Sequence, residues 1–154
     1  MSQAFRHLKR VPITLPNDVA PIYFVTCCCA GRRVVFNLAE RVDMAHRELL
    51  ESRTRLSWIV GSVVYMPDHV HLFCCPPRRE GHLLSRFIGA WRSAVSRRLR
   101  ACGLEGPLWQ RGFFDHVLRS GESYSEKWEY TRSNPERAGV ADFRRWFEVD
   151  VLRM

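Results

Sequence analysis

The chain has 154 residues, of which 46% are apolar. This length suits one domain with a buried core, and the apolar content excludes an intrinsically disordered protein. No apolar run approaches the roughly 20 residues that cross a membrane, and the first residues lack the apolar segment of a secretory signal. We therefore expect a cytoplasmic protein without membrane association.

The positive charge comes almost entirely from arginine. The net charge is +8, and the chain has 22 arginines but only two lysines, Lys9 and Lys127. The planar guanidinium group suits bidentate contact with phosphate. Nucleic acid is therefore the expected class of partner. A solvated basic face, or an arginine bias of the coding genome, is the alternative explanation.

Six cysteines raise the question of a metal site or disulfides. They stand at 27–29, 74–75 and 102, and no pair has the C-x-x-C spacing of a zinc site. Adjacent residues of a strand point to opposite faces, so neither cluster forms a ready chelate. We expect these cysteines to act as small apolar residues in a reduced protein.

The sequence pattern predicts a basic arm over residues 1–20 and a single domain over 21–154. Within the domain, β-branched and aromatic runs indicate strands, and apolar residues at helical spacing indicate helices. The expected elements of the first half are a strand from Ile22 to Ala30, a helix from Leu38 to about Arg53, a central strand from Leu56 to Met66, a turn at Pro67-Asp68, and a strand from His69 to Cys75.

The second half continues with a long helix and one more strand. The expected elements are a helix from His82 to Arg100, a loop from Gly103 to Pro107, a strand from Phe113 to Arg119, and a short helix that the capping pair Ser123 and Glu126 opens and Pro135 ends. The order β-α-β-β-α-β predicts an α+β, ferredoxin-like antiparallel sheet. Both main helices would cover one face, and the short helix would lie on the other.

Two histidines stand one residue apart in the predicted strand YMPDHVHLFCC. His69 and His71 share one face, while Val70, Leu72 and Cys74 share the other and can pack against the helices. Side chains at i and i+2 lie about 6–7 Å apart, so two imidazoles can converge on one ion. Histidine pairs without a metal are also common, so a second element has to complete a site.

The short helix supplies candidates for that second element. Tyr130 and Asn134 are four residues apart and therefore share a helical face. An amide oxygen can join two neutral imidazoles around a hard divalent ion, and a tyrosine beside it can attack a polarised phosphate. Packing of Tyr130 in the core and capping by Asn134 are the alternatives.

Four segments together resemble one known family. MPDHVHL is similar to the metal motif of the HUH single-tyrosine transposases, in which two histidines flank one apolar residue. PIYFVTCCCAGRRVVF, LWQRGFFDHVLR and EYTRSNPERAGV resemble, in order, the first strand, the fourth strand and the tyrosine helix of the REP-associated branch. The match spans roughly residues 21–140. Many relatives have asparagine where this chain has Asp68, and both types suit the turn.

The resemblance implies a site and a reaction. His69, His71 and Asn134 would hold Mg²⁺ or Mn²⁺, and Tyr130 would be the nucleophile. The enzyme would cleave and rejoin single-stranded DNA beside hairpins of repetitive palindromes, through a 5′-phosphotyrosine, acting as a monomer or a homodimer. Tyr124 is the competing nucleophile, but it lies off the face that carries the ligands and is expected to pack.

Six further residues are expected to contact DNA, on the basis of their charge or aromatic character and their place beside the predicted strands and helix. They are Arg32, Arg33, Arg92, Trp109, Arg111 and Arg119. Trp109 could stack on an unpaired base, but it is equally suited to the core. His116, next to Asp115 in the fourth predicted strand, is expected to be structural.

Three other classes of function remain open at this point. A domesticated protein that binds hairpin DNA without cleaving it would keep the basic surface, although it would not need the tyrosine, asparagine and histidines together. A replication-type nickase shares the chemistry but usually has a larger chain. A structural zinc protein is disfavoured by the spacing of the cysteines.

Overall fold

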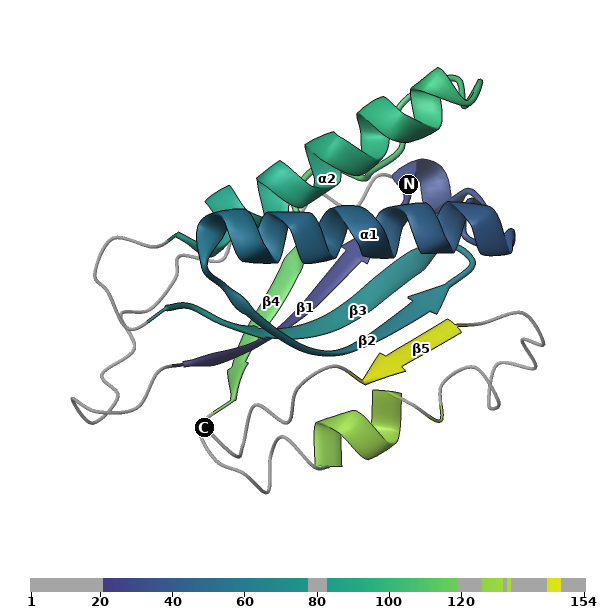
Figure 1. Ribbon diagram of the computed structural model, residues 1–154. Coiled ribbons are helices and arrows are strands. Elements are labelled where there is room, and N and C mark those ends of the chain that lie inside the picture. Colours follow the sequence, from purple (N-terminus) through teal and green to yellow (C-terminus); the bar gives the residue numbers. More distant parts are fainter. Residues whose placement is uncertain (1–20, 78–82, 119–125, 132, 134–143, 148–154) are drawn as a thin grey trace.

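In the computed structural model the chain forms one five-stranded antiparallel sheet with two long helices packed against it (Figure 1). The structure describes residues 21–77, 83–118, 126–131, 133 and 144–147. The strand order is β4-β1-β3-β2-β5. The first four strands thus have the order of a ferredoxin-like sheet, as the sequence predicts. The predicted basic arm over residues 1–20 and the capping serine Ser123 lie outside the described residues.

The first strand and helix follow the predicted pattern, with shifted ends. Strand β1 covers Ile22–Cys28, and a short 3-10 helix, η1, covers Ala30–Arg32, so the strand ends before Ala30. Helix α1 covers Ala39–Leu56. It continues past Arg53, and Ser57 ends it in a left-handed conformation with φ 57°. Leu56 therefore belongs to the helix and not to the second strand. The sequence assigns it to the strand because an apolar residue fits the spacing of either element.

Strands β2 (Ile59–Met66) and β3 (His69–Cys75) form the predicted hairpin. β2 is buried along nearly its whole length and is an interior strand, because β5 (Arg144–Phe147) pairs with its outer edge. Strand β5 is not among the elements that the sequence predicts. Its four residues lack an alternating pattern, and their pairing partner is distant in the chain.

Helix α2 covers Leu84–Ala101 and strand β4 covers Phe114–Leu118, each within two residues of the predicted ends. Strand β4 pairs with β1 and forms an edge of the sheet. A short helix is present at 126–131, where the tyrosine helix is predicted. Among the described residues, no helix is both long and apolar enough to cross a bilayer.

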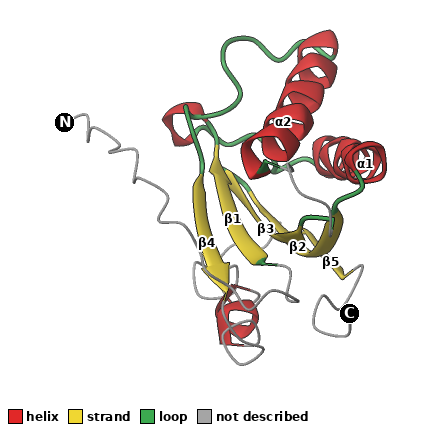
Figure 2. Ribbon diagram, turned by 90° about the vertical axis from the view of Figure 1, so that its left-hand side faces the viewer, coloured by secondary structure: helices red, strands yellow, loops and turns green. Residues whose placement is uncertain are grey.

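The sheet separates two apolar clusters. Figure 2 shows the two long helices on one side of the sheet and the short helix on the other. The larger one lies between the sheet and the two long helices and includes Val70, Leu72 and Cys74, the apolar set predicted for that face. The smaller one lies on the opposite face, where Phe73 meets Trp128 of the short helix at 6.0 Å between ring centroids. The predicted fold class, with the short helix opposite the two main helices, is confirmed.

All six cysteines are free, and five of them are buried. Burial raises the pKa of Cys27 and of Cys29 to about 12, with neighbouring charges adding smaller effects. Burial likewise raises the pKa of Cys74 well above its usual value. These thiols stay protonated and pack as small apolar groups, as the sequence predicts. Cys102, at the end of α2, is exposed.

Trp91 joins the two helices, since its ring is fully buried and its Nε1–H donates a hydrogen bond to the Ala45 carbonyl at 2.9 Å. We expect Trp91→Ala to lower the free energy of unfolding by about 3–5 kcal/mol, because it leaves a large cavity and removes this bond. Trp91→Phe should cost less. The matched control, Val34→Ala at a position 57% exposed, should change it by less than about 0.5 kcal/mol. Urea denaturation measures all three, and equal losses for Trp91→Ala and Val34→Ala would contradict this packing.

Candidate active site

The two histidines of β3 face each other in the arrangement that two ligands of one ion adopt. The Nε2 atoms of His69 and His71 are 3.1 Å apart, and the rings are inclined by 80°. Two ligand atoms at right angles around an ion with bonds of about 2.1 Å would be about 3.0 Å apart. The backbone of β3 thus places the two Nε2 atoms close enough together to bind one ion, as the sequence predicts, without any rearrangement.

Each imidazole is held in place through its other nitrogen. His69 Nδ1 lies 2.6 Å from Asp68 Oδ1, and His71 Nδ1 lies 2.8 Å from Thr26 Oγ1. A carboxylate only accepts hydrogen bonds, so the Nδ1 of His69 carries the proton and its Nε2 presents a lone pair. Such outer partners are what orient histidine ligands in metal sites.

Both histidines are neutral at physiological pH. Burial above all, with smaller contributions from His69, Lys127 and Arg32, lowers the pKa of His71 to about 3. Burial also lowers the pKa of His69, although its hydrogen bond to Asp68 opposes the shift. A neutral imidazole is the form that binds a metal ion, so the buried setting keeps both rings ready as ligands.

Arg32 completes a chain of contacts that ends at His69. Its Nε lies 2.9 Å from Asp68 Oδ2, while Asp68 Oδ1 contacts the imidazole. The guanidinium group also donates to Cys28 Sγ at 3.1 Å. Arg32 has φ 56°, a left-handed conformation that is uncommon outside glycine. The strained turn at the end of β1 therefore places this side chain against Asp68.

The short helix lies on the same face of the sheet as the histidines. His71 stacks on Phe24 at 5.3 Å between ring centroids, and Lys127 Nζ lies 4.9 Å from the centroid of Phe24. Tyr130 is one helical turn from Lys127 and is 57% exposed. Figures 1 and 2 show this helix across the sheet from α1 and α2. The predicted nucleophile and the two histidines thus belong to one face.

Two of the predicted site residues, Asn134 and Arg119, lie outside the described residues, and so does the competing tyrosine, Tyr124. The third metal ligand therefore stays a prediction. Among the residues that the structure describes, no group of three or more histidine, cysteine and acidic side chains is arranged to hold a metal ion. The predicted third ligand, Asn134, would supply an amide oxygen, and asparagine is not one of these residue types.

The remaining predicted DNA contacts lie around η1 and the segment that leads into β4. Arg33 donates to the Glu105 carbonyl at 2.7 Å, and Arg111 is exposed. Arg92 donates to the carbonyls of Gly112 and Gln110. The Trp109 ring packs against the core, and its Nε1–H donates to the Arg92 carbonyl at 3.0 Å. All of these hydrogen bonds join parts of the protein to one another. That these residues contact DNA stays a prediction.

Sequence reasoning did not identify Thr26, Asp68 or Lys127 as parts of the site. Thr26 is the one polar residue in IYFVTCC, an apolar strand, and this exception is a usable signal. Asp68 precedes the histidine directly, but its turn position alone accounts for an aspartate. The ion pair between Arg32 and Asp68 has no local signal, because η1 and the β2–β3 turn are distant in the chain.

The contact with Asp68 predicts a definite tautomer for His69. At neutral pH its Nδ1 should be protonated and its Nε2 unprotonated, which long-range ¹H–¹⁵N correlation spectra distinguish. Asp68→Ala should move His69 toward the Nε2–H tautomer, because the acceptor is lost. Asp68→Asn keeps an acceptor oxygen and should retain the parent tautomer, and the exposed His116 should be unaffected in both variants. A protonated Nε2 on His69 of the parent protein would contradict the arrangement.

Comparison with known proteins gives no matching family model. The REP-associated tyrosine transposase of Escherichia coli K12 is 26% identical over 136 residues, which cover 85% of this chain and 79% of the relative. The structure of a REP-associated tyrosine transposase bound to a REP hairpin aligns with a TM-score of 0.70 and 21% identity, over 92% of this chain and 76% of that one.

A second solved structure, of a protein from Deinococcus radiodurans R1, aligns with a TM-score of 0.57 and 18% identity, over 82% of this chain and 97% of that one. At such identities the structural matches establish the fold, while the Escherichia coli relative extends the likeness to most of the sequence. The chain therefore resembles the REP-associated tyrosine transposases in both sequence and fold, as its four motifs predict.

Proposed function

We propose that the chain is a transposase that cleaves and rejoins single-stranded DNA next to a hairpin, with Tyr130 as its nucleophile. The observation that carries the proposal is the pair of facing Nε2 atoms of His69 and His71, 3.1 Å apart, on the sheet face that also carries the helix of Tyr130. This arrangement lies on the face of the sheet opposite the larger core.

The residues present fit a hard divalent cation, Mg²⁺ or Mn²⁺. His69 and His71 would hold it together with Asn134, and Asp68 and Thr26 would keep the two rings oriented. When bound, such an ion polarises a phosphodiester and stabilises the negative charge that develops on its oxygens. Stabilising this negative charge lowers the barrier for attack by a weak nucleophile such as a tyrosine hydroxyl.

Tyr130 supplies the nucleophile of the proposed reaction. Its hydroxyl oxygen forms a bond to the phosphorus of the target phosphodiester, and the bond between that phosphorus and the 3′ oxygen breaks. The phenolic proton passes, in net terms, to the departing 3′ oxygen, which leaves a 5′-phosphotyrosine and a free 3′-OH. A second 3′-OH can reverse the step on another strand without ATP, because the phosphotyrosine keeps the ester bond.

Hairpin DNA is the proposed substrate for two reasons. A similar structure is described as bound to a REP hairpin, and the net charge of +8 suits a polyanion. A protein that binds such a hairpin without cleaving it is the alternative. The exposed tyrosine, on the sheet face that also carries the two oriented histidines, favours the enzyme.

A substitution that removes only the hydroxyl group of Tyr130 tests its role as the nucleophile. Tyr130→Phe should abolish cleavage of a single-stranded substrate with a hairpin and abolish the covalent protein–DNA adduct seen after denaturation. Binding should stay within a few fold, because only the hydroxyl is removed. An adduct that persists in Tyr130→Phe and disappears in Tyr124→Phe would assign the role to Tyr124. Binding without any adduct in the parent protein, at saturating Mn²⁺, would favour the protein that only binds.

The metal can be tested independently of the tyrosine. His71→Ala should weaken Mn²⁺ binding, measured by calorimetry or by the EPR signal of the free ion, at least 100-fold, since loss of an outer partner alone typically costs 10–100-fold. Chelator should stop adduct formation by the parent, and Mg²⁺ or Mn²⁺ should restore it. His116→Ala, on exposed β4, is the matched control and should bind Mn²⁺ like the parent. Equal Mn²⁺ affinity in both variants would remove the histidine pair from the site.

A further inference from the structure

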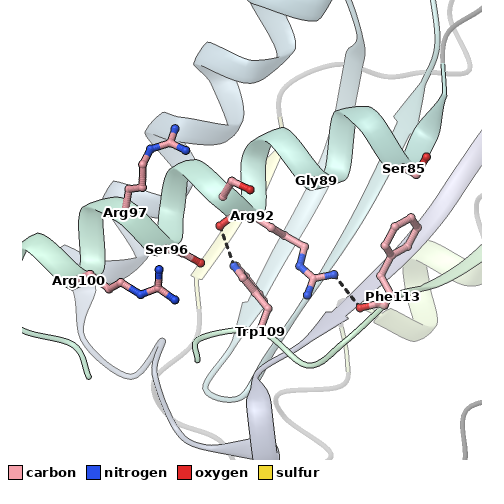
Figure 3. Close-up of a pocket in the computed structure, with 10 residues that line it drawn as sticks. Ser85, Gly89, Arg92, Ser96, Arg97, Arg100, Trp109 and Phe113 are labelled. Carbon is pink, nitrogen blue, oxygen red and sulfur yellow. Dashed lines mark hydrogen bonds between the residues drawn. The ribbon is translucent and has the colours of Figure 1, made fainter. Parts of the chain in front are cut away.

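A groove runs along α2 on the helix side of the sheet, away from the histidine pair (Figure 3). Its volume is about 550 Å³. One wall is the outer face of α2, with Ser85, Gly89, Ser93 and Ser96. The other wall is the segment that leads into β4, with Trp109, Gly112 and Phe113. We call this feature the α2 groove.

The α2 groove is basic. Arg92, Arg97 and Arg100 line it, and none of its lining residues is acidic. Figure 3 shows the side chain of Arg100 extending along α2 toward Trp109. Arg98, which points to the other side of the helix, is neutralised by Glu48 at 2.7 Å. Within the described residues neither Arg97 nor Arg100 forms such an ion pair, so both cations are available to an anionic ligand.

Arg92 holds the two walls of the α2 groove together. Its guanidinium group donates to the carbonyl of Gly112 at 2.7 Å and to that of Gln110, and it lies 5.5 Å from the centre of the Trp109 ring. These contacts hold the segment against α2 and keep the two walls at a fixed separation. The groove is therefore formed before any ligand arrives.

At Gly89 the wall of the groove that α2 forms has no side chain. A glycine in a helix interior destabilises the helix relative to alanine. Nothing lies within 4 Å of the position that a Cβ would occupy at Gly89, so no contact inside the protein requires the missing side chain. The missing side chain leaves the backbone of α2 open to close approach at this point of the groove.

We propose that the α2 groove binds the sugar–phosphate backbone of the paired stem of a DNA hairpin, an inference that rests on the proposed function. Hydroxyls and guanidinium groups are the usual partners of phosphate oxygens. Unpaired bases would need a free aromatic ring to stack on, but Trp109 and Phe113 are partly buried against the core, and the guanidinium group of Arg92 lies over the Trp109 ring. Duplex DNA keeps its bases stacked internally and needs only backbone contacts.

The placement of the α2 groove also separates the stem from the reacting strand. Trp109 forms a bridge to Cys29, and the Gln110 N–H donates to the Cys28 carbonyl at 2.9 Å. Cys28 is the residue of β1 that pairs with His69. One wall of the groove is thus fastened to the end of the sheet where the histidines lie. DNA can contact the groove with its stem and pass round this end to present an unpaired flank to Tyr130.

The test uses the full chain and three fluorescent DNA probes: a hairpin with an unpaired flank, a blunt duplex of the stem, and the single-stranded flank. Arg97→Gln combined with Arg100→Gln should weaken binding of the hairpin and the duplex roughly 10- to 30-fold at 0.15 M salt. The log–log salt slope should fall by about 2, as expected for two lost phosphate contacts. Arg47→Gln combined with Arg55→Gln removes the same charge from the exposed face of α1 and should change affinity less than threefold.

Gly89→Gln supplies a second, independent readout. It should raise the melting temperature, because glutamine favours a helix over glycine, and yet weaken duplex binding several fold. A fall in melting temperature, or unchanged duplex binding, would overturn the role given to Gly89. An equal loss of single-stranded and duplex binding in the arginine variant would overturn the assignment to the stem.

The outcome is separable from that of the proposed function. If the groove assignment is wrong, the arginine variant binds the hairpin like the parent and still forms the Tyr130 adduct. If the proposed function is wrong, the parent forms no adduct with any of the three probes. A variant that binds the duplex poorly but forms the adduct normally on the single-stranded flank is the result expected from both proposals together.

Discussion

The antiparallel pairing of β1 with β3 is the interaction on which the candidate site depends. Its register sets Thr26 opposite His71 and Cys28 opposite His69. The first pair gives one imidazole its hydrogen-bond partner, and the second brings η1, with Arg32, to the turn that carries Asp68. A shift of this register by one residue would turn both histidines into the core beneath the helices. The burial of Val70 and Leu72 on that side opposes such a shift.

Much of this arrangement could be predicted because it depends on local periodicity. Alternation in β3 predicts which side chains share a face with His69 and His71, and the order of helices and strands predicts the sheet. Leu56 shows the limit of this reasoning, since one apolar residue suits the end of a helix or the start of a strand, and the left-handed Ser57 decides between them. The sequence does not predict strand β5, because its place depends on pairing with an edge of β2 far away in the chain.

Side-chain roles proved harder to predict than backbone elements. Arg92 and Trp109 are predicted to contact DNA from their chemical type and their place in the chain, yet the side chains of both donate hydrogen bonds to backbone carbonyls of the protein. Asp68 was interpreted only as a turn residue, although it is also the acceptor for a histidine and the partner of Arg32. Residue type and spacing indicate what a side chain can do, whereas its partners depend on contacts between distant segments.

The burial of the cysteines has a consequence for the reactivity of the whole protein. Five thiols lie in the interior, and burial keeps those of Cys27, Cys29 and Cys74 protonated, so alkylating reagents and oxidants cannot attack them without unfolding. Cys102 alone is exposed, two residues beyond Arg100. A thiol-directed label would therefore attach at one position of the folded chain, at the end of α2 and across the sheet from the histidines.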